Sequence, residues 1–183
     1  FAMLHGVSYG YEQMNNQFII DSGDLYTFYR TGEASEKEIK NFKKFKIKNI
    51  IKHGNLFSPW SGEKFDIIIN DVSGVSSAIA KKSTWFKNVP CSTGVDGSNL
   101  TVKILNQSSK FMNKNGKLIF PIISLSNVEK IMKLTRMKFN KVSILSKNEW
   151  FLPDELLNEK NLLIKLKKKK FVDFKTKFGK IIC

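Results

Sequence analysis

The stretch KFDIIINDVSGVS, Lys64 to Ser76, decides how the rest of the chain is interpreted. Phe65 to Ile69 is almost continuously apolar, which is typical of a strand buried on both faces of a parallel sheet. The run then breaks into Asn70-Asp71-Val72-Ser73-Gly74, which presents an amide, a carboxylate and a hydroxyl together. Polar groups directly after a buried strand indicate either caps for a following helix or parts of a site.

Alternating helix and strand patterns lie on both sides of this strand. Helices are predicted where apolar residues recur every three or four positions, and strands where short apolar runs end in turn residues. The predicted elements are a helix at 35–45, a strand at 50–51, one or two helical turns at 76–82, helices at 98–112 and 124–137, strands at 118–123 and 139–150, and two antiparallel strands within 161–183.

This order predicts an α/β fold: a Rossmann-like, mostly parallel sheet with helices on both faces and an antiparallel C-terminal strand pair. A chain of 183 residues is long enough for one domain, 1–183, although 1–34 carry no clear pattern. In such sheets ligands bind beyond the carboxyl ends of the strands. Residues 70–73 and 121–124 therefore lie where a site is expected, and Asn55 follows the strand before them.

The chain is strongly basic, with 31 Lys and Arg against 16 Asp and Glu, a net charge of +15. This charge favours phosphate backbones or acidic partners, but an AT-rich genome would also produce a chain so rich in Lys, Asn and Ile. The most basic segment is KLKKKK, Lys165 to Lys170. It has two interpretations: an exposed strand edge protected by lysines, or a nucleic-acid contact.

Several features bear on location and cofactors. No apolar run approaches the roughly 20 residues that span a bilayer, so no membrane association is expected, and the start carries no cleavable signal pattern. Cys91 and Cys183 do not suggest a disulfide framework, and a cytoplasmic protein is expected. No spacing of metal ligands is present, so no metal is expected.

Three motifs follow one another in the order of a known enzyme family. HGNLFSPWSGEKFDIII (53–69) looks like a Gly-Asp-Leu-Phe turn before a Phe-Asp strand, and NDVSGV (70–75) stands where the family has Asn-Pro-Pro-Tyr. GVDGSNLTVKILNQSSKFMNKNGKLIF (94–120) looks like its Gly-x-Asp-Gly-Leu-x-Leu helix with the strand after it. The chain thus resembles class I S-adenosylmethionine-dependent methyltransferases over about 49–123. The closest likeness is to the branch that methylates glutamine side chains or the N6 amine of adenine.

The resemblance implies an acceptor site at 70–73. In the family the Asn accepts hydrogen bonds from the target amine and an aromatic ring stacks on the target. Here Asp71 falls on the Asn position, which implies a catalytic role for Asp71 with Asn70, and substrate contacts for Val72 and Ser73. A carboxylate can accept from an amine and can also take a proton. Because Gly74 replaces the ring, flipped adenine is less favoured as the substrate.

Trp85 and Phe86 lie in the loop that follows the predicted turns at 76–82. They would stack on a planar substrate or form a lid, or else pack that loop onto the core. Asp71 and Ser73 also have a plainer interpretation, as caps of the helix that follows the strand.

The resemblance implies S-adenosylmethionine as cofactor, held by two segments. Asn55 falls on an acidic position that touches the adenine amine, with Gly54 and Leu56 on either side. Asp21 and Gly23, in IIDSGD (19–24), resemble what is left of the first strand and its loop.

The family's Gly-x-Gly-x-Gly pattern is not found, and too few residues separate Gly23 from the strand at 50–51. Either cofactor binding is lost, or the chain lacks a segment; the second is favoured because both ends look incomplete.

Two functions from different classes follow. The first is methyl transfer to a nitrogen or oxygen of a protein or RNA substrate, which needs a positioned nucleophile and no metal. The second is a catalytically inactive methyltransferase-like module that binds nucleic acid or serves as a protein scaffold, which the missing Gly-rich loop favours. A nucleotide-binding fold with other chemistry is a third interpretation, since fold alone does not decide function.

Overall fold

The computed structural model describes part of the chain. The backbone is described at 2–6, 17–21, 24–28, 49–51, 56–72, 74–84, 93–177 and 180–182, and the side chains at 56–70, 74–84, 93–177 and 181–182. The chain divides into two compact units: unit 1 is Phe1–Val72 with Asn106–Pro121, and unit 2 is Ser73–Leu105 with Ile122–Cys183. The prediction of one domain over 1–183 stays a prediction, and the predicted helix at 35–45 lies outside the described residues.

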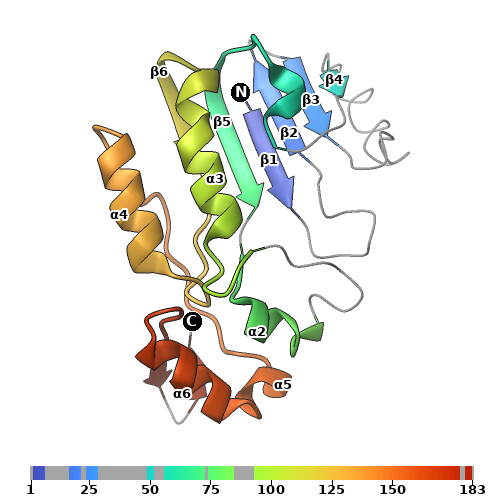
Figure 1. Cartoon of the computed structure of the whole chain (residues 1–183). Helices are drawn as coiled ribbons and strands as arrows, with labels where there is room; N and C mark the ends of the chain where they lie inside the picture. Colours follow the sequence, from blue (N-terminus) through green and yellow to red (C-terminus); the bar gives the residue numbers. More distant parts are fainter. Residues whose placement is uncertain are drawn as a thin grey trace. The chain divides into compact units, whose positions relative to one another are not determined.

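Unit 1 contains a six-stranded sheet in the order β4-β3-β2-β1-β5-β6 (Figure 1). β5 pairs in parallel with β1 on one side and with β6 on the other, and β3 and β4 are also parallel. β2 runs antiparallel to both of its neighbours, β1 and β3. The fold is therefore mixed α/β. The strands are β1 (Ala2–Gly6), β2 (Gln17–Asp21), β3 (Asp24–Phe28), β4 (Asn49–Ile51), β5 (Phe65–Val72) and β6 (Met112–Ile119).

The strand predicted from Phe65 is confirmed and reaches Val72. Phe65 and Ile68 are fully buried, and Ile68 is in register with Ala2 of β1 and with Leu118 of β6. Ile67 and Ile69 are half-buried and Asp66 is exposed, so the expected burial on both faces is only partly met.

β6 begins earlier than predicted, at Met112 rather than at Leu118, and ends at Ile119. Phe65 pairs with Met112 but Ile67 pairs with Lys117, so β6 carries extra residues at a bulge. Gly116 lies in the bulge, where a Cβ atom would lie only 2.9 Å from the carbonyl oxygen of Phe65. The Asn-Lys-Asn-Gly sequence that suggested a turn is thus accommodated inside the strand.

Aromatic side chains pack beside the start of β5. Trp60, in the short 3-10 helix η1 (Ser58–Trp60), meets Phe65 edge to face with ring centroids 5.8 Å apart. Phe57 stacks on Phe111, which ends the 3-10 helix η3 (Ser108–Phe111), at a centroid distance of 4.6 Å. Such pairs add about 0.5–1.5 kcal/mol each to the burial of their surface.

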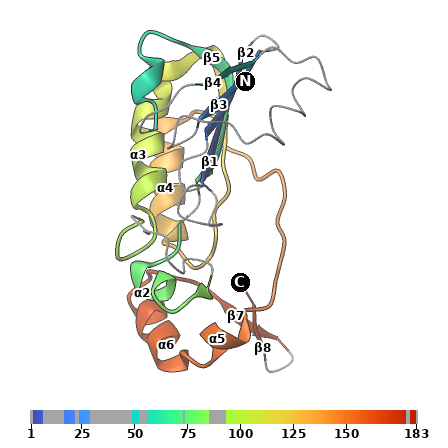
Figure 2. The same cartoon turned by 90° about the vertical axis from the view of Figure 1, so that its right-hand side faces the viewer.

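Unit 2 is mainly helical. The predicted helices at 98–112 and 124–137 are confirmed as α3 (Asn99–Gln107) and α4 (Val128–Lys138). The last two residues of α3 and the 3-10 helix η3, which continues it, belong to unit 1. α4 starts after Asn127, whose side chain accepts a hydrogen bond from the Lys130 N–H at 3.0 Å. The other elements are α2 (Ser77–Ala80), α5 (Asp154–Leu157), α6 (Lys160–Lys168), β7 (Lys175–Lys177) and β8 (Lys180–Ile182). α5, α6 and the β7–β8 pair lie together in both views (Figures 1 and 2).

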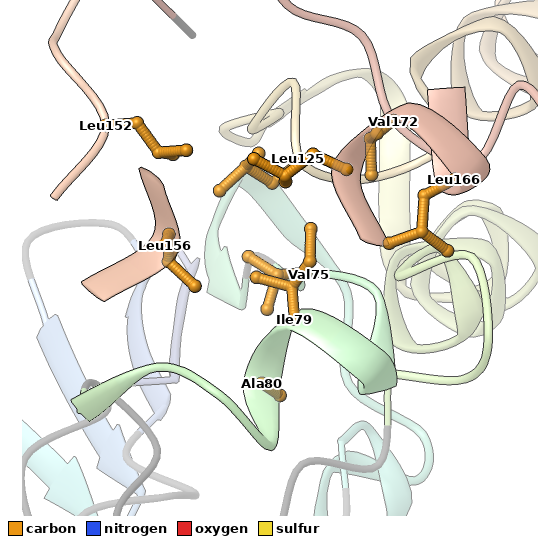
Figure 3. Close-up of a cluster of buried hydrophobic side chains, with 9 residues drawn as sticks. Val75, Ile79, Ala80, Leu125, Leu152, Leu156, Leu166 and Val172 are labelled. Carbon is orange, nitrogen blue, oxygen red and sulfur yellow. The ribbon is translucent and has the colours of Figure 1, made fainter. Parts of the chain in front are cut away.

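The core of unit 2 gathers apolar side chains from segments far apart in the sequence. Figure 3 shows Val75, Ile79 and Leu125 directed toward one another, with Leu156 and Leu166 around them. Burying side chains of this size contributes about 1.5–3 kcal/mol each. The buried members of this cluster are Val75, Ile79, Ala80, Leu125, Leu152, Leu156, Leu163, Leu166 and Val172.

The prediction of a strand at 139–150 is wrong. This segment forms no strand, and Ile144 and Leu145 are each 75% exposed. Val142, Ile144 and Leu145 are residue types typical of strands, but a strand also needs an edge to pair with. The residues that follow the segment, Phe151 and Leu152, bond to β8 through a bridge to Ile182 and a 3.0 Å hydrogen bond to Ile181.

The antiparallel strand pair predicted within 161–183 is confirmed only in its second half, where β7 pairs with β8. Residues 160–168 form α6 instead, so the interpretation of Lys165–Lys170 as a strand edge is wrong. Leu163 and Leu166, three residues apart, are both buried on one stripe of the helix. Leu and Lys are good helix formers, and this stripe selects the helix over the strand.

Adjacent residues of α6 provide a test of this packing. Leu163 is fully buried and Ile164 is 50% exposed. Replacing Leu163→Ala is expected to lower the free energy of unfolding by about 2–5 kcal/mol, because it leaves a cavity in the core. Ile164→Ala should change it by less than about 0.5 kcal/mol. Urea denaturation of the two variants checks this, and equal losses would contradict the assigned helix face.

Candidate functional site

The polar residues after the apolar part of β5 belong to the strand itself. Asn70, Asp71 and Val72 are its last three residues, and Asp71 is in register with His5 of β1. Asn70 is 1% exposed, so its amide lies in the protein interior. The side chains of Asp71 and Val72, and the whole of Ser73, lie outside the described residues. Their roles as catalytic and substrate-binding residues stay predictions.

Of the predicted cofactor-binding residues, Leu56 is the one described with its side chain. It is buried and has a left-handed backbone, with φ of 50°. That conformation is uncommon for a bulky residue and costs about 1–3 kcal/mol, and such strain clusters beside ligand sites. Gly54 and Asn55 lie outside the described residues.

The predicted remnant of a cofactor loop lies at the end of β2. Asp21, the last residue of β2, is in antiparallel register with Asp24 of β3. The chain therefore turns back into a second strand within two residues. Gly23, and also Trp85 and Phe86, lie outside the described residues. The roles of Asp21, Gly23, Trp85 and Phe86 stay predictions.

The segment 74–76, which follows the predicted acceptor residues, is held closely within unit 2. A Cβ atom on Gly74 would overlap the carbonyl oxygen of Gly97 and would lie 2.5 Å from Cγ2 of Thr93. Thr93 Oγ1 donates to the Val75 carbonyl at 2.6 Å, and the Ser76 N–H donates to the Leu125 carbonyl at 2.9 Å. Gly74 and Gly97 are therefore small because two backbone segments approach closely there.

Asp96 joins the beginnings of α3 and α4. One carboxylate oxygen accepts from the Ser98 hydroxyl at 2.8 Å and from the Ser98 N–H at 3.1 Å. The other accepts from Lys130 Nζ at 3.0 Å and from the Asn127 amide at 3.3 Å. The Asp96 carbonyl also accepts from the Asn127 N–H at 2.8 Å. A carboxylate between two helix starts is further favoured by the positive ends of their dipoles.

The environment of Asp96 shifts its titration. Burial alone would raise the pKa of the carboxyl, but hydrogen bonds from Ser98 and Lys130, together with the Lys130 charge, outweigh it. The pKa of Asp96 therefore lies below the ordinary value of 3.8. The network holds the 93–98 loop in place with every carboxylate oxygen bonded, which is a structural role.

Asp96 lies in the motif at 94–120, and the local part of its network was predictable from the sequence. An Asp in a turn commonly accepts a hydrogen bond from the backbone N–H two residues later, here that of Ser98. The contacts of Asp96 with Asn127 and Lys130, more than thirty residues away, depend on how the helices pack.

Comparisons with protein-family models, curated proteins and solved structures gave no match. Within the part of the chain that the structure describes, no group of three or more His, Cys, Asp or Glu residues could hold a metal ion. No helix among those residues has the length and apolar character needed to cross a bilayer. The function therefore has to be inferred from the residues of β5 and their surroundings.

Gly74→Ala tests the close approach behind the acceptor segment. We expect a loss of about 3 kcal/mol in the free energy of unfolding, because backbone atoms on both sides have to move. Gly94→Ala is the matched control: its φ is 81° but a Cβ would meet only the Asn99 side chain, at 3.3 Å. It should cost about 1 kcal/mol from backbone strain. Denaturation curves check the order, and a smaller loss for Gly74→Ala would contradict the packing.

Asp96→Asn tests the charged network through pH. Because the folded pKa of Asp96 is lowered, its contribution is complete above pH 3.8 and disappears as the pH falls through the folded pKa. The variant should be less stable than the native chain by about 1–2 kcal/mol at neutral pH, with this difference shrinking toward pH 3.

Asp173→Asn provides the control for the Asp96 experiment. Asp173 pairs with Lys167 at 3.2 Å, but its side chain is 70% exposed, so the cost should stay below about 0.5 kcal/mol. Free energies of unfolding of the native chain and of both variants, measured at several pH values, test this prediction. A difference for Asp96→Asn that grows as the pH falls would contradict the assigned ionisation.

Proposed function

We propose that this chain is an S-adenosylmethionine-dependent methyltransferase with a Rossmann-like fold, and that Asn70-Asp71-Val72-Ser73 position its methyl acceptor. The observation that supports this most directly is β5, which has a parallel neighbour on each side and polar residues at its carboxyl end. Parallel sheets bind ligands at that end of their strands. The motif resemblance over about 49–123 adds the reaction class.

The cofactor would be held by Gly54, Asn55 and Leu56, with Asp21 and Gly23 as the second segment. The amide oxygen of Asn55 can accept a hydrogen bond from an adenine amine. The left-handed backbone of Leu56 is strain of the kind found beside ligands. S-adenosylmethionine supplies a methyl group on a positively charged sulfur, which keeps the carbon–sulfur electron pair when the acceptor's lone pair takes the methyl.

Asp71 would act on the acceptor. Its carboxylate can accept a hydrogen bond from the N–H or O–H of the acceptor and so aim the lone pair for an in-line attack. It can then take the acceptor's proton and pass it to water, which is general-base catalysis. The buried Asn70 next to it would keep the end of the strand in position.

The acceptor is proposed to be a nitrogen or oxygen of a protein or RNA substrate. With Gly74 in place of an aromatic residue, the acceptor loop offers no ring on which adenine would stack. The net charge of +15 favours a substrate that carries phosphates or acidic groups.

A module that binds without catalysis is the second candidate. The observation that favours it is β2, which runs antiparallel to both neighbours and returns directly into β3. A dinucleotide-type cofactor loop instead leads from a parallel strand into a helix. Calorimetric titration with S-adenosylmethionine separates the candidates. Binding with a Kd of about 1 μM supports the enzyme, and no binding at about 1 mM supports the module.

Asp71→Ala tests the catalytic assignment. Incubation with isotope-labelled S-adenosylmethionine and candidate protein and RNA acceptors, followed by mass spectrometry, should show methyl transfer reduced about 10²–10⁴-fold. Cofactor affinity measured by titration should stay within about threefold, because Asp71 is assigned to the acceptor.

The control for Asp71→Ala is Asp66→Ala in the same strand. Asp66 is exposed and accepts a 2.8 Å hydrogen bond from Asn113, at the opposite end of β5. Its replacement should leave methyl transfer within about threefold. Equal losses in the two variants would indicate damage to the sheet and would remove the case for Asp71 as a base.

A further inference from the structure

The lysines near the end of the chain lie on the solvent-exposed side of a helix. α6 buries Leu163 and Leu166; Asn161, Ile164, Lys165 and Lys168 lie on its opposite side, and Lys160 lies on its flank. Lys169 follows at the C-cap, and all four lysines are exposed. We call Lys160, Lys165, Lys168 and Lys169 the α6 basic face. Because the leucines are fixed in the core, these charges are presented by an ordered helix.

The charges of the α6 basic face are not balanced by neighbouring carboxylates. Among the described residues, ion pairs in this region go to other lysines: Lys167 pairs with Asp173 at 3.2 Å, Lys170 with Glu129 at 3.5 Å and Lys82 with Glu159 at 2.9 Å. The four lysines of the face form no ion pair with any described carboxylate. They do not protect a strand edge either. Lys165, Lys168 and Lys169 lie in the last turn and at the C-cap of α6, where the helix dipole favours cations, and their exposed ammonium groups stay available to a phosphate.

We propose that the α6 basic face binds the phosphate backbone of single-stranded RNA. From Lys160 to Lys168 the helix rises about 12 Å. Lysine on a flexible stem suits such contacts because it neutralises a phosphate without a fixed hydrogen-bond geometry.

Two aromatic rings lie at the end of α6. Phe171 and Phe174 are half-buried and pack against the core of unit 2, and a cation lies over each: Lys169 Nζ is 5.9 Å from the first ring centroid and Lys167 Nζ is 4.5 Å from the second. Partly exposed rings beside a positively charged track are how proteins hold single strands without sequence preference. Cellular RNA offers such unpaired loops and ends.

An anionic membrane fits this face less well. A helix that lies on a membrane inserts its apolar side chains, but Leu163 and Leu166 are used in the core of unit 2. Ile164 is the exposed apolar residue that remains on the face. The lysines would attract a lipid surface, but little apolar area is left to enter it.

RNA binding is independent of the methyl-transfer proposal, and its test contains no cofactor. Fluorescence anisotropy of the full chain with a labelled uridine oligomer of about 12 nucleotides measures the Kd between roughly 50 and 200 mM salt. Replacing all four lysines of the face by Gln should weaken binding about tenfold or more. It should also reduce the slope of log K against log salt by about 3, from four single-strand contacts.

The control removes the same charge elsewhere in unit 2. Lys133, Lys138, Lys141 and Lys147 are exposed and, among the described residues, form no ion pair. Their joint replacement by Gln should change the Kd by less than about threefold. Arg at the four positions of the α6 basic face should retain binding, since the charge is kept. If the Gln variant does not fold, the native chain decides: a salt slope smaller in magnitude than about 1 overturns the proposal.

Three other results would also overturn RNA binding by this face. They are equal weakening in the two Gln variants, which indicates general basicity; competition by polyglutamate as effective per charge as by RNA; and tighter binding to phosphatidylserine vesicles than to the oligomer. Binding of RNA without S-adenosylmethionine binding would keep this inference and exclude the enzyme. Binding of S-adenosylmethionine without RNA binding would keep the methyltransferase proposal and exclude RNA binding by the α6 basic face.

Discussion

The pairing of β5 on both edges is the constraint on which unit 1 depends. With β1 and β6 hydrogen-bonded to it, its backbone groups are paired on both edges, and Phe65 and Ile68 are fully buried. Its polar residues lie toward its two ends: the exposed Asp66 near the start, and Asn70 and Asp71 at the carboxyl end. The same edge is where parallel sheets bind ligands. Folding and the proposed chemistry therefore both favour polar residues at the carboxyl end of β5.

Unit 2 is organised by two kinds of contact that the apolar core alone would not provide. Gly74 and Gly97 let two backbone segments approach at a distance that no side chain would tolerate. Asp96 then joins the 93–98 loop to the start of α4 through Asn127 and Lys130. A buried carboxylate costs free energy unless it is bonded, and here both oxygens have two donors. The segment just after the predicted acceptor residues is thereby held rigidly within this unit.

The proposed activity and the proposed RNA surface use different parts of the chain. One depends on the end of β5, and the other on the α6 basic face, whose four lysines form no ion pair with a described carboxylate. A methyltransferase that acts on RNA would use both the end of β5 and the α6 basic face, since non-specific binding of the phosphate backbone raises the local concentration of the acceptor. A binding module would use only the second. The two proposals are therefore separable by experiment.

Much of the secondary structure was predictable because its signals are local. The apolar run from Phe65 to Ile69 is typical of a strand, and the apolar stripes of α3 and α4 repeat with the period of a helix. Other elements depended on which segment packs or pairs against them. Residues 139–150 include Val142, Ile144 and Leu145, which are apolar as in a strand, but no strand forms there. Residues 160–168 look equally strand-like, and the joint burial of Leu163 and Leu166 makes them a helix.

The candidate site and the lysine cluster also have parts that the sequence predicts and parts that depend on packing. The sequence by itself determined that polar residues follow the apolar run of β5, because that break is a local pattern, but not that Asn70, Asp71 and Val72 belong to the strand. It also determined the net charge and the lysine cluster. Only the tertiary structure decided that Asp96 reaches Asn127 and Lys130, that Gly74 meets Gly97, and that the lysines of α6 share an exposed face. Those contacts join residues that are far apart along the chain, so they depend on packing that no local pattern encodes.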